Sequence, residues 1–460
     1  MKRLERDLPT VLMSIETATR ELDSKLVLAA ALADRGCRAI VAHKESAHEI
    51  ARHSRRVIWL GKSVFNRKHE RTSLVLDLIR NESPLIYHHD EGGIYPEKIW
   101  ETCVLRSHPP ELFAQGSYAK VCTWGKKQAA LLSARVPTLN GTFTVTGSPR
   151  FDVCAPKFAW IDSTYESQSR SRYLPYILVN TRFPAVMHAE GPTFGFLHEM
   201  LPVAWPSWMS PHEVRDLWYS KWSQDARDLA SFLVLIKELA VANPKFTIVV
   251  RPHPSESVEF YEVALGPLEN VVVIQDGSVV SWIRSASLVV HCKCTTGVEA
   301  AIAGRPVLHF WPDRERDTGR GETVAREAGV TVGTIGEALE KAAGLLNGVL
   351  HPQTWSPPAL EMLNNLVRPA TPLLVEETLN VMNERAIDSS DVRVPPRPRR
   401  FRPMGFLRRK LRPRQPSYVE SKRGRMDPTR IAGVVRGCQE FYRGARLKAV
   451  TDRYAIVEPA

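Results

Sequence analysis

The sequence alternates between short apolar runs and amphipathic stretches, and this alternation restricts the chain to few folds. From Thr10 to about Arg150, strand-like runs such as TVLMSIE and CRAIVAH are separated by stretches with helical spacing. The stretch from Arg20 to Arg35 is the clearest of these helices, and Gly36 ends it. Strands that alternate with helices predict a parallel sheet covered by helices on both faces.

A second series of the same kind begins at YILVNTRF and continues through FTIVVRPHP, NVVVIQDG, LVVHCK and PVLHFW. Helical patterns fill most of the chain after it, up to about Arg385. We therefore predict an α/β fold with two doubly wound parallel-sheet domains facing a cleft. The first would cover residues 1–152. The second would cover residues 153–385, with an irregular insertion at 184–224 that is rich in Pro, Trp and Met, and with closing helices.

Nearly all of the excess positive charge lies in one segment. The 40 residues from Asp391 to Arg430 contain 14 Lys or Arg and 3 Asp or Glu, which is +11 of the chain's net +12. We predict that residues 386–460 form a Pro/Arg-rich basic tail without continuous order. A neutral body with a basic tail favours attachment to an anionic membrane surface through residues 393–430, with no specific nucleic acid as partner. A solvated tail and an RNA-binding arm are the alternatives.

Other features of the sequence bear on location and cofactors. No apolar run approaches the roughly 20 residues of a membrane span, and the N-terminus has no apolar signal core. Seven scattered cysteines are typical of reduced thiols, so we expect a cytoplasmic protein that is peripheral at the inner membrane. There is no Walker loop and no dinucleotide glycine fingerprint, and His291, Cys292 and Cys294 lack a second ligand pair. We expect neither a cofactor nor a metal.

Two motifs of the second series suggest a phosphate site. RPHP, Arg251 to Pro254, follows a strand directly, and Arg251 and His253 offer donors suited to a phosphate. CTTGVEAAIAGRPV follows the strand LVVHCK and opens a helix whose free N–H groups favour an anion. Thr295 or Thr296 is expected to cap this helix. A rigid turn and an ordinary helix cap are the alternatives.

Glu299 lies one turn into the same helix. In many nucleotide-sugar enzymes a carboxylate at this place holds a ribose hydroxyl, and the spacing from Glu299 to Gly304-Arg305-Pro306 is similar. The alternative is a glutamate that only stabilises the helix N-terminus. We predict that a nucleotide-activated donor substrate is bound by Arg251, His253, Pro254, Thr295, Thr296 and Glu299.

Carboxylates of the first series are candidates for catalysis. Asp90 and Glu91 follow the strand SPLIY in the motif HHDEGGIYP, and a carboxylate there could act as general base for an acceptor hydroxyl. Asp152, in TGSPRFD, could act as nucleophile or electrostatic stabiliser. A common Asp/Gly turn and a pairing of Asp152 with Arg150 are the alternatives. Further residues expected at the cleft are Arg20, Glu21, Arg150, Asn180 and Lys293.

Together these motifs resemble a family of bacterial surface carbohydrate biosynthesis proteins. The resemblance runs in order through RELDSKLVLAAALADRG, HHDEGG, GSPRFD, NTRF, RPHP and CTTGVEAAIAGRPV, from about Val11 to Leu379. This family looks related to retaining β-Kdo transferases, which are GT-B enzymes that use CMP-Kdo. More distantly, RPHP and the Thr-Thr segment are similar to motifs of bacterial sialyltransferases and CDP-glycerol glycerophosphotransferases.

The resemblance implies a GT-B-like fold and a role for several residues. His253 and the Thr295–Thr296 turn would hold a cytidylate phosphate, Glu91 would be a catalytic carboxylate, and Asp152 would be the nucleophile of a double displacement. Where the family has a second acid after Asp-Glu, this chain has Gly92.

The function expected from the sequence is transfer of a Kdo-like acidic sugar from a CMP donor to a glycan or lipid-linked acceptor. Such a glycosyltransferase would serve the synthesis of capsule or lipopolysaccharide. The alternatives are a polyol-phosphate transferase using CDP-glycerol, a UDP-sugar epimerase, and a non-catalytic scaffold in a polysaccharide assembly complex.

Overall fold

The computed structural model describes most of the 460 residues. The described ranges are 1–5, 8–62, 64, 74–89, 94, 99–113, 118–164, 170–194, 208–312, 323–349, 354–396 and 426–460.

The first sheet has eight strands in the order β15-β16-β3-β2-β4-β5-β6-β7. Their bounds are β2 (Thr10–Ile15), β3 (Arg38–His43), β4 (Ile58–Gly61), β5 (Leu85–His88), β6 (Tyr118–Thr123), β7 (Phe143–Val145), β15 (Ala445–Val450) and β16 (Tyr454–Pro459). β2 pairs in parallel with β3 and β4, whereas β16 pairs antiparallel with both β3 and β15. A separate short ladder joins β1 (Lys2–Arg3) to β14 (Arg393–Val394).

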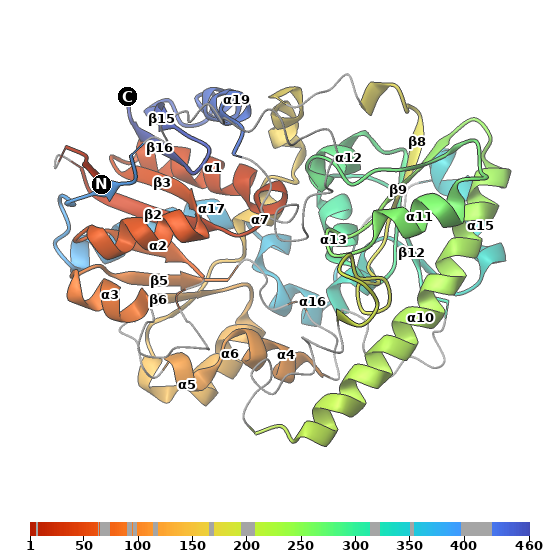
Figure 1. Ribbon diagram of the computed structural model, residues 1–460, viewed down its shortest axis with the longest axis horizontal. Coiled ribbons are helices and arrows are strands. Elements are labelled where there is room, and N and C mark those ends of the chain that lie inside the picture. Colours follow the sequence, from red (N-terminus) through yellow and green to blue (C-terminus); the bar gives the residue numbers. More distant parts are fainter. Residues whose placement is uncertain are drawn as a thin grey trace, which may run out of the picture. The chain divides into compact units, whose positions relative to one another are not determined.

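Helices cover the central strands of this sheet, which are buried on both faces. α1 buries most of its side chains and contacts β3, β16 and α19, while α2 contacts β2 and β3 (Figure 1). The bounds are α1 (Ala18–Asp34), α2 (Lys44–His53), α3 (Leu74–Arg80), α4 (Trp100–Ser107), α5 (Pro110–Phe113), α6 (Lys126–Arg135), η3 (Pro137–Leu139), α17 (Ala370–Glu384) and α19 (Pro428–Cys438).

The second sheet has six strands in the order β10-β9-β8-β11-β12-β13, and every pair is parallel. Its strands are β8 (Tyr176–Asn180), β9 (Thr247–Arg251), β10 (Val271–Val273), β11 (Leu288–His291), β12 (Val307–Phe310) and β13 (Val330–Val332). The helices in this part of the chain are α7 (Pro149–Asp152), η4 (Pro156–Thr164), α10 (Pro211–Ala242), α11 (Val258–Leu265), α12 (Val279–Ser285), α13 (Thr295–Ile302), α14 (Thr323–Glu327), α15 (Ile335–Leu346), α16 (Pro357–Met362) and η7 (Asn364–Leu366).

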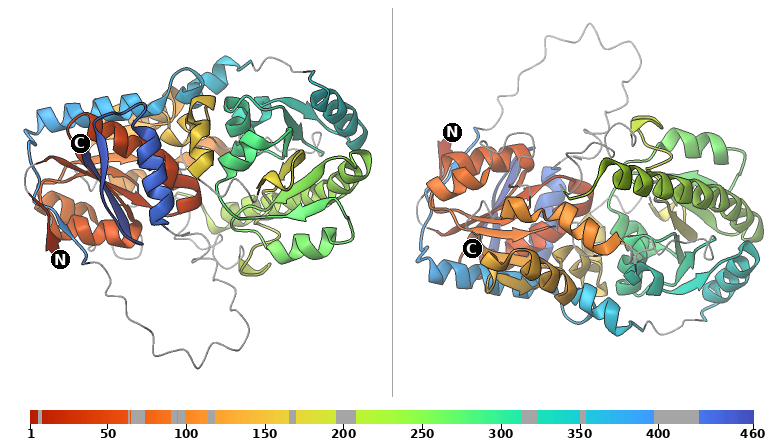
Figure 2. Two further views of the ribbon diagram at one scale, coloured as in Figure 1. Left: turned by 90° about the horizontal axis from the view of Figure 1, so that it is seen from above. Right: turned by 90° about the horizontal axis from the view of Figure 1, so that it is seen from below.

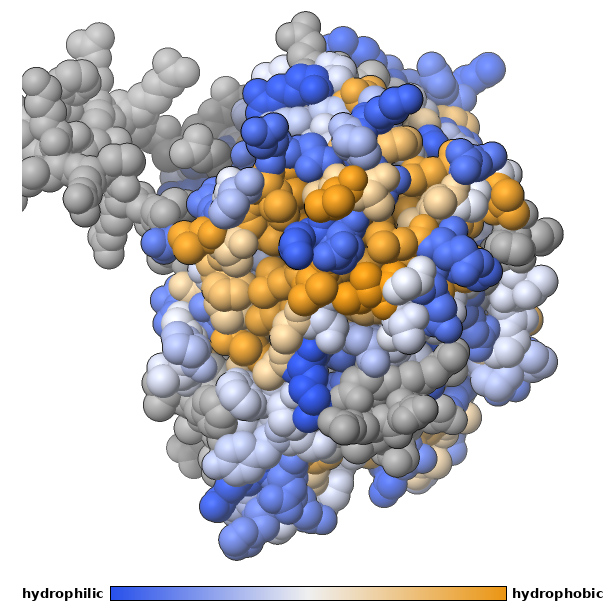
Figure 3. All heavy atoms as spheres, turned by 90° about the vertical axis from the view of Figure 1, so that its right-hand side faces the viewer, coloured by the Kyte–Doolittle hydropathy of each residue, from blue (hydrophilic) through white to orange (hydrophobic). Residues whose placement is uncertain are grey.

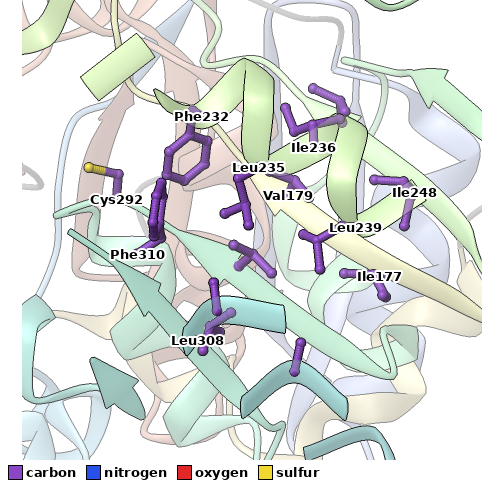
Figure 4. Packing of buried hydrophobic residues seen from close by; sticks show 14 of the residues in the cluster. Ile177, Val179, Phe232, Leu235, Ile236, Leu239, Ile248, Cys292, Leu308 and Phe310 are labelled. Atoms are coloured by element: carbon purple, nitrogen blue, oxygen red, sulfur yellow. The ribbon is translucent and has the colours of Figure 1, made fainter. Parts of the chain in front are cut away.

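Hydrophobic cores lie on both faces of the second sheet. On one face, α10 places Phe232, Leu235, Ile236 and Leu239 against strand residues such as Ile248 (Figure 4). A second cluster, which includes Trp282 of α12 and Ala300 of α13, covers the other face. Burial on both faces explains why these strands read as continuous apolar runs rather than as an alternating pattern.

The structure confirms the predicted fold class, α/β and GT-B-like with two doubly wound sheets. The second sheet is parallel throughout, and the first carries the antiparallel strands β15 and β16 beside its parallel strands. The chain divides into two compact units, residues 1–87 with 377–460 and residues 88–376. The predicted boundary at residue 152 and the predicted cleft stay predictions.

The basic tail is the main correction to the sequence analysis. Residues 386–460 were expected to lack continuous order, but residues 426–460 form α19, β15 and β16, and β16 pairs with β3 (Figure 2, left, dark blue). The strand YAIVEP is buried. It is a single apolar run that follows many arginines, and the sequence analysis therefore assigned it to the basic tail. The basic segment 397–425 lies outside the described residues.

The predicted insertion at 184–224 also needs correction. α10 begins at Pro211, inside the predicted insertion, because Ser210 and Glu213 form a capping box with Pro211 at the first helical position. The signal was present in the sequence as Ser-Pro-His-Glu. Residues 195–207 of the insertion lie outside the described part of the chain.

One face of the second unit exposes apolar side chains. The exposed residues of α10 and α11 include Val234, Val241 and Val263, and Figure 3 shows a face of this unit on which hydrophobic side chains gather. Within the described ranges, no helix combines the length and the apolar character that a membrane crossing requires.

Candidate functional site

The carboxyl edge of the second sheet has the topology that places ligands in parallel α/β sheets. The chain runs from β8 outward to β9 and β10 and then returns to β11 on the other side of β8, so the strand order reverses between β8 and β11. Ligands of open α/β sheets bind beyond such a reversal. Asn180 ends β8 and lies opposite His291, which ends β11. The segments after these two strands therefore form the candidate site.

Asn180 is buried at this reversal with part of its amide unsatisfied. Its Nδ2 has no hydrogen-bond partner among the described residues. Buried amide groups are normally paired, so a donor left open at a strand end indicates a place for a ligand or a water. Asn180 thus lies at a strand end, and its neighbours Thr181 and Arg182 take part in the surrounding contacts described below.

Glu256, which the sequence analysis missed, organises the RPHP loop. Its carboxylate accepts hydrogen bonds from the Thr181 hydroxyl at 2.5 Å, the His253 backbone N–H at 2.6 Å and the Tyr261 hydroxyl at 3.2 Å. It also accepts one from the backbone N–H of Phe183. One buried carboxylate therefore fixes the loop after β9 to the loop after β8.

Glu256 is strongly affected by its burial. Loss of solvation raises the pKa of Glu256 to about 7, and the hydrogen bonds from Thr181, Phe183 and His253 oppose this rise. A lone Glu in a Ser-rich loop carries no sequence signal of such a role, because its partners come from three separate segments.

His253 and Pro254 lie in a turn whose hydrogen bonds define the tautomer of the His253 ring. The backbone N–H of Glu256 donates to the His253 carbonyl at 2.8 Å, and Pro254 takes the second position of this turn, where its fixed φ is favourable. The Nδ1 atom of His253 accepts from the backbone N–H of Ser255 at 3.2 Å, so a neutral ring carries its proton on Nε2. His253 is thus half-buried at a strand end as a donor suited to a phosphate oxygen.

Arg251 differs from the prediction. Its guanidinium donates to the backbone carbonyls of Asp276 at 2.6 Å and Gly277 at 2.5 Å. Burial lowers the pKa of Arg251 to about 10, which the nearby Asp276 opposes. These bonds hold the loop after β10 and give Arg251 a structural role; its contact with a phosphate stays a prediction.

No side chain of the described residues caps the start of α13. Cys294 occupies the N-cap position, and neither Thr295 nor Thr296 caps the helix as predicted, because both already lie within its first turn. The Thr296 hydroxyl is buried and has no hydrogen-bond partner in the described structure. Uncapped N–H groups at a helix N-terminus favour an anion, and the hydroxyl adds another donor at the same place.

The backbone before α13 is held in an unusual conformation. Lys293 has φ of +49°, which a non-glycine residue adopts rarely. Its ammonium lies 3.1 Å from the carboxylate of Asp228 on α10, and its carbonyl accepts from Arg182. Burial raises the pKa of Asp228, and Lys293 opposes the rise. Such local strain is found at functional sites that the surrounding structure stabilises.

Gly297 of α13 permits a close approach of the helix to β11. A Cβ at Gly297 would lie 2.2 Å from the Nε2 atom of His291. His291 is completely buried, stacks on His309 at 4.8 Å, and has a pKa lowered to about 4 by that burial. The two histidines are therefore neutral packing groups. Among the described residues, no group of three or more His, Cys, Asp or Glu could hold a metal ion.

The structure brings together Arg150 and Glu299, which belong to two different sequence motifs. Neither motif predicted this pair. Their side chains are almost fully buried, and Arg150 Nη2 lies 3.1 Å from Glu299 Oε1. Arg150 also lies over the rings of Trp124 and Phe151. The second carboxylate oxygen of Glu299, Oε2, is buried and has no hydrogen-bond partner within the described ranges. An open acceptor on a buried, paired carboxylate matches a hydroxyl donor from a ligand.

Asp152 has a structural environment. Its carboxylate accepts from the Asn365 amide at 2.7 Å and from the backbone N–H groups of Ala370 at 2.9 Å and Thr371 at 2.6 Å, at the start of α17. Burial raises the pKa of Asp152, and these bonds oppose the rise. Both oxygens are engaged, so Asp152 caps the start of α17; its role as nucleophile stays a prediction. Arg150, the partner considered for Asp152 in the alternative reading, makes an ion pair with Glu299.

The remaining predicted residues lie elsewhere. Asp90 and Glu91 lie outside the described residues. Arg20 and Glu21 are in the first unit, where Glu21 is buried at the start of α1. Its carboxylate accepts from the backbone N–H groups of Glu16 and Thr17.

Comparisons with known proteins assign no family. No family model matches the chain, and no curated protein matches it. Similar solved structures include Staphylococcus aureus MnaA with UDP, which is 14% identical over 82% of this chain and 97% of that chain, with a TM-score of 0.48. The UDP-GlcNAc 2-epimerase from Methanocaldococcus jannaschii is 14% identical over 80% and 99%, with a TM-score of 0.48. The wall teichoic acid polymerase TagF is 9% identical over 82% and 90%, with a TM-score of 0.43. Similarities of this size assign neither a site nor an activity to the chain.

Proposed function

We propose that the chain is a glycosyltransferase that uses a CMP-activated acidic sugar, of the Kdo kind, in the synthesis of a bacterial surface polysaccharide. The observation that carries this proposal is a pair of buried oxygens on α13, Thr296 Oγ1 and Glu299 Oε2, that have no hydrogen-bond partner among the described residues. They lie one turn apart on a helix without a side-chain cap, at the point where the strand order of a parallel sheet reverses.

The first turn of α13 would hold the donor phosphate. The N–H groups of the first turn and the helix dipole favour negative charge, and the Thr296 hydroxyl can donate to the same group. His253, with its proton on Nε2, supplies a donor from the loop after β9. The buried Glu256 holds this loop in place. The imidazole of His253 is therefore already positioned before the donor substrate binds.

Glu299 would bind the ribose. Its Oε1 is paired with Arg150, which orients the carboxylate, and its Oε2 has no hydrogen-bond partner among the described residues and can accept one. If the donor phosphate binds at the first turn of α13, a ribose hydroxyl of the same nucleotide would lie within reach of Glu299 and could donate a hydrogen bond to its Oε2. This support is for a nucleotide in general; the choice of cytidine comes from the resemblance of the RPHP and Thr-Thr motifs.

Catalysis stays assigned to the carboxylates of the HHDEGG motif. Glu91 would act as general base toward the acceptor hydroxyl, with Asp90 beside it in the sequence. Asp152 is not retained, because its two oxygens cap α17. Without that nucleophile the double displacement has no assigned covalent intermediate, and we do not propose a stereochemical course. No cofactor beyond the donor substrate is proposed.

Two variants test the proposed donor site. We expect Thr296→Val and His253→Ala to weaken CMP binding about tenfold each, since each removes one hydrogen bond to a charged group. His212→Ala, on the exposed N-terminal turn of α10, is the matched control and should bind CMP as the wild type does. Titration calorimetry measures the CMP affinity of the wild type and of the three variants. Equal affinity of Thr296→Val, His253→Ala and the wild type would contradict the site.

A further inference from the structure

Two buried histidines lie side by side on the second sheet, next to the loop that leads into α13. His291 ends β11 and His309 lies opposite it on β12, with their ring centroids 4.8 Å apart. Both side chains are completely buried. Burial lowers the pKa of His291 to about 4 and holds the pKa of His309 well below its usual value, to which the neighbouring His291 and Lys293 also contribute. Both rings are therefore neutral at physiological pH.

Each ring accepts a hydrogen bond from the backbone before α13. The N–H of Lys293 donates to His309 Nε2 at 3.2 Å, and the N–H of Cys294 donates to His291 Nδ1 at 3.4 Å. A backbone N–H can only donate, so each contact requires an unprotonated ring nitrogen, which the neutral state supplies. Two consecutive residues of one loop are thus tied to two neighbouring strands.

The second nitrogen of each ring is also constrained. Neutral His309 carries its proton on Nδ1, which donates to the Thr331 hydroxyl at 3.1 Å, and that hydroxyl donates to the Arg326 carbonyl at 2.9 Å. Neutral His291 carries its proton on Nε2, close to Gly297 in the first turn of α13, where a Cβ would lie 2.2 Å from that nitrogen. The two rings are therefore opposite tautomers in defined orientations.

The backbone that the histidines hold contains the strained turn before α13. Lys293 has φ of +49°, in the left-handed region that a non-glycine residue adopts rarely, and Cys294 is the N-cap residue of the helix. A rare backbone conformation persists where the surrounding structure stabilises it. The bonds to His309 and His291 act on the strained residue itself and on the next one. They also direct these two N–H groups toward the rings.

We propose that His291 and His309 are positioning residues of the donor site. By holding the loop before α13, they set the direction in which the first turn of this helix meets the donor phosphate. The inference rests on the proposed function, because it assigns the two residues to the same site. It adds that the geometry of that site depends on two hydrogen-bond acceptors within the sheet, and not only on groups that contact the ligand.

Two pairs of variants separate the hydrogen bond from the packing of the ring. His309→Gln places an amide oxygen near the position of Nε2, whereas His309→Met has a similar length and only a weak acceptor. His291→Asn keeps an acceptor near the position of Nδ1, whereas His291→Leu has the same shape and none. All four variants lose the stacked ring, so a difference within a pair reports on the hydrogen bond.

Two measurements apply to each pair. Hydrogen exchange of single amides in the free full-length protein shows whether the loop is held, and titration calorimetry gives the CMP affinity. We expect the Lys293 amide to exchange about tenfold faster in His309→Met than in His309→Gln, and CMP to bind about tenfold more weakly, since one hydrogen bond is lost. The Cys294 amide should distinguish His291→Leu from His291→Asn in the same way. Equal values within a pair, in either measurement, overturn the role of that histidine.

Gly297→Ala disturbs the same ring without removing a polar group. The added methyl would lie 2.2 Å from His291 Nε2, so we expect the Cys294 amide to exchange faster and CMP to bind about tenfold more weakly. Gly344→Ala is the matched control. It adds the same methyl to α15, where no described atom beyond the adjacent backbone lies within 4 Å, and both quantities should stay at the wild-type values. Wild-type behaviour of Gly297→Ala contradicts the inference.

The wild-type titration separates this inference from the proposed function. If the wild type binds no CMP, the proposed function fails, and the role of the histidines in a donor site fails with it. If the wild type and all the histidine variants bind CMP with equal affinity, the donor site stands and the inference alone is wrong.

Discussion

At the scale of single residues, buried carboxylates in this chain hold backbone in place, and their sequence motifs alone do not reveal this. Asp152 lies in a motif suited to catalysis, yet its oxygens accept from Asn365, Ala370 and Thr371. Glu256 lies in no motif, yet it receives four hydrogen bonds at the carboxyl edge of the second sheet. Apart from the Tyr261 hydroxyl, the partners are distant in the sequence or belong to the backbone, so spacing could not predict them.

Asp152→Asn tests the capping role. The amide removes a charged acceptor at the N-terminus of α17, and we expect a loss of about 1–2 kcal/mol in the free energy of unfolding. CMP affinity should not change, because Asp152 has no assigned contact with the donor. Denaturant unfolding and calorimetry measure the two quantities. A sugar adduct on Asp152 in an intact-mass spectrum of a reacting mixture would restore it as the nucleophile.

Glu256 predicts a pH dependence of stability with a definite sign. Burial raises its pKa from 4.5 to about 7, so between these pH values the folded protein holds a proton that the unfolded chain has released. The group therefore lowers the free energy of unfolding as pH rises through this window, by about 3 kcal/mol in total. Unfolding is measured at pH 4.5 to 8 for the wild type and for Glu256→Gln, which does not titrate. Parallel stability curves of the two proteins would contradict the assignment.

At the scale of elements, the C-terminal strands belong to the first sheet. β16 pairs with β3, and Arg38 of β3 makes a buried ion pair of 2.6 Å with Glu458 of β16. Removing one partner of a buried pair leaves an uncompensated charge. We expect Glu458→Gln to lower the free energy of unfolding by about 3–5 kcal/mol.

Lys448 supplies the control for this ion pair. It also contacts Glu458, at 3.4 Å, but its side chain is half-exposed. Lys448→Met should therefore cost less than about 1 kcal/mol. Denaturant unfolding compares both variants with the wild type, and equal small effects would show that the C-terminal strand contributes little to the fold.

The elements that the sequence predicted well are those with long or repeated patterns. The strands of both parallel series and helices such as α1 follow from continuous apolar runs and helical spacing, which depend only on neighbours in the chain. β13 and β15 escaped prediction, since one is short and the other alternates with charged residues at the edge of a sheet. The start of α13 was found, but its N-cap was not, because a helix boundary shifts easily by one residue.

At the scale of the whole molecule, the basic segment remains the proposed route to the membrane. Residues 397–425 contain 12 Lys or Arg and one Glu. Anionic lipids contribute about 1 kcal/mol for each basic residue near the surface. The proposal places the enzyme in the cytoplasm, at the inner leaflet, where lipid-linked acceptors would lie.

The folded C-terminus determines how this proposal must be tested. A chain cut after Arg385 would lose β15 and β16 together with the basic segment, so a loss of binding could reflect unfolding. Replacement of the Lys and Arg residues of 397–425 by Ser leaves the strands intact. We expect the wild type to co-sediment with anionic vesicles at moderate salt and the replaced chain to stay in solution. Equal binding of both chains, or binding of neither, contradicts the proposal.

The central claim is that the second unit binds a cytidine nucleotide at the start of α13. Titration calorimetry of the full-length wild type with CMP, UDP and ADP tests it most directly. The account predicts that CMP binds, and that CMP at about 100 times its dissociation constant raises the free energy of unfolding by about 2.7 kcal/mol. Strong binding of UDP or ADP without any binding of CMP would contradict it.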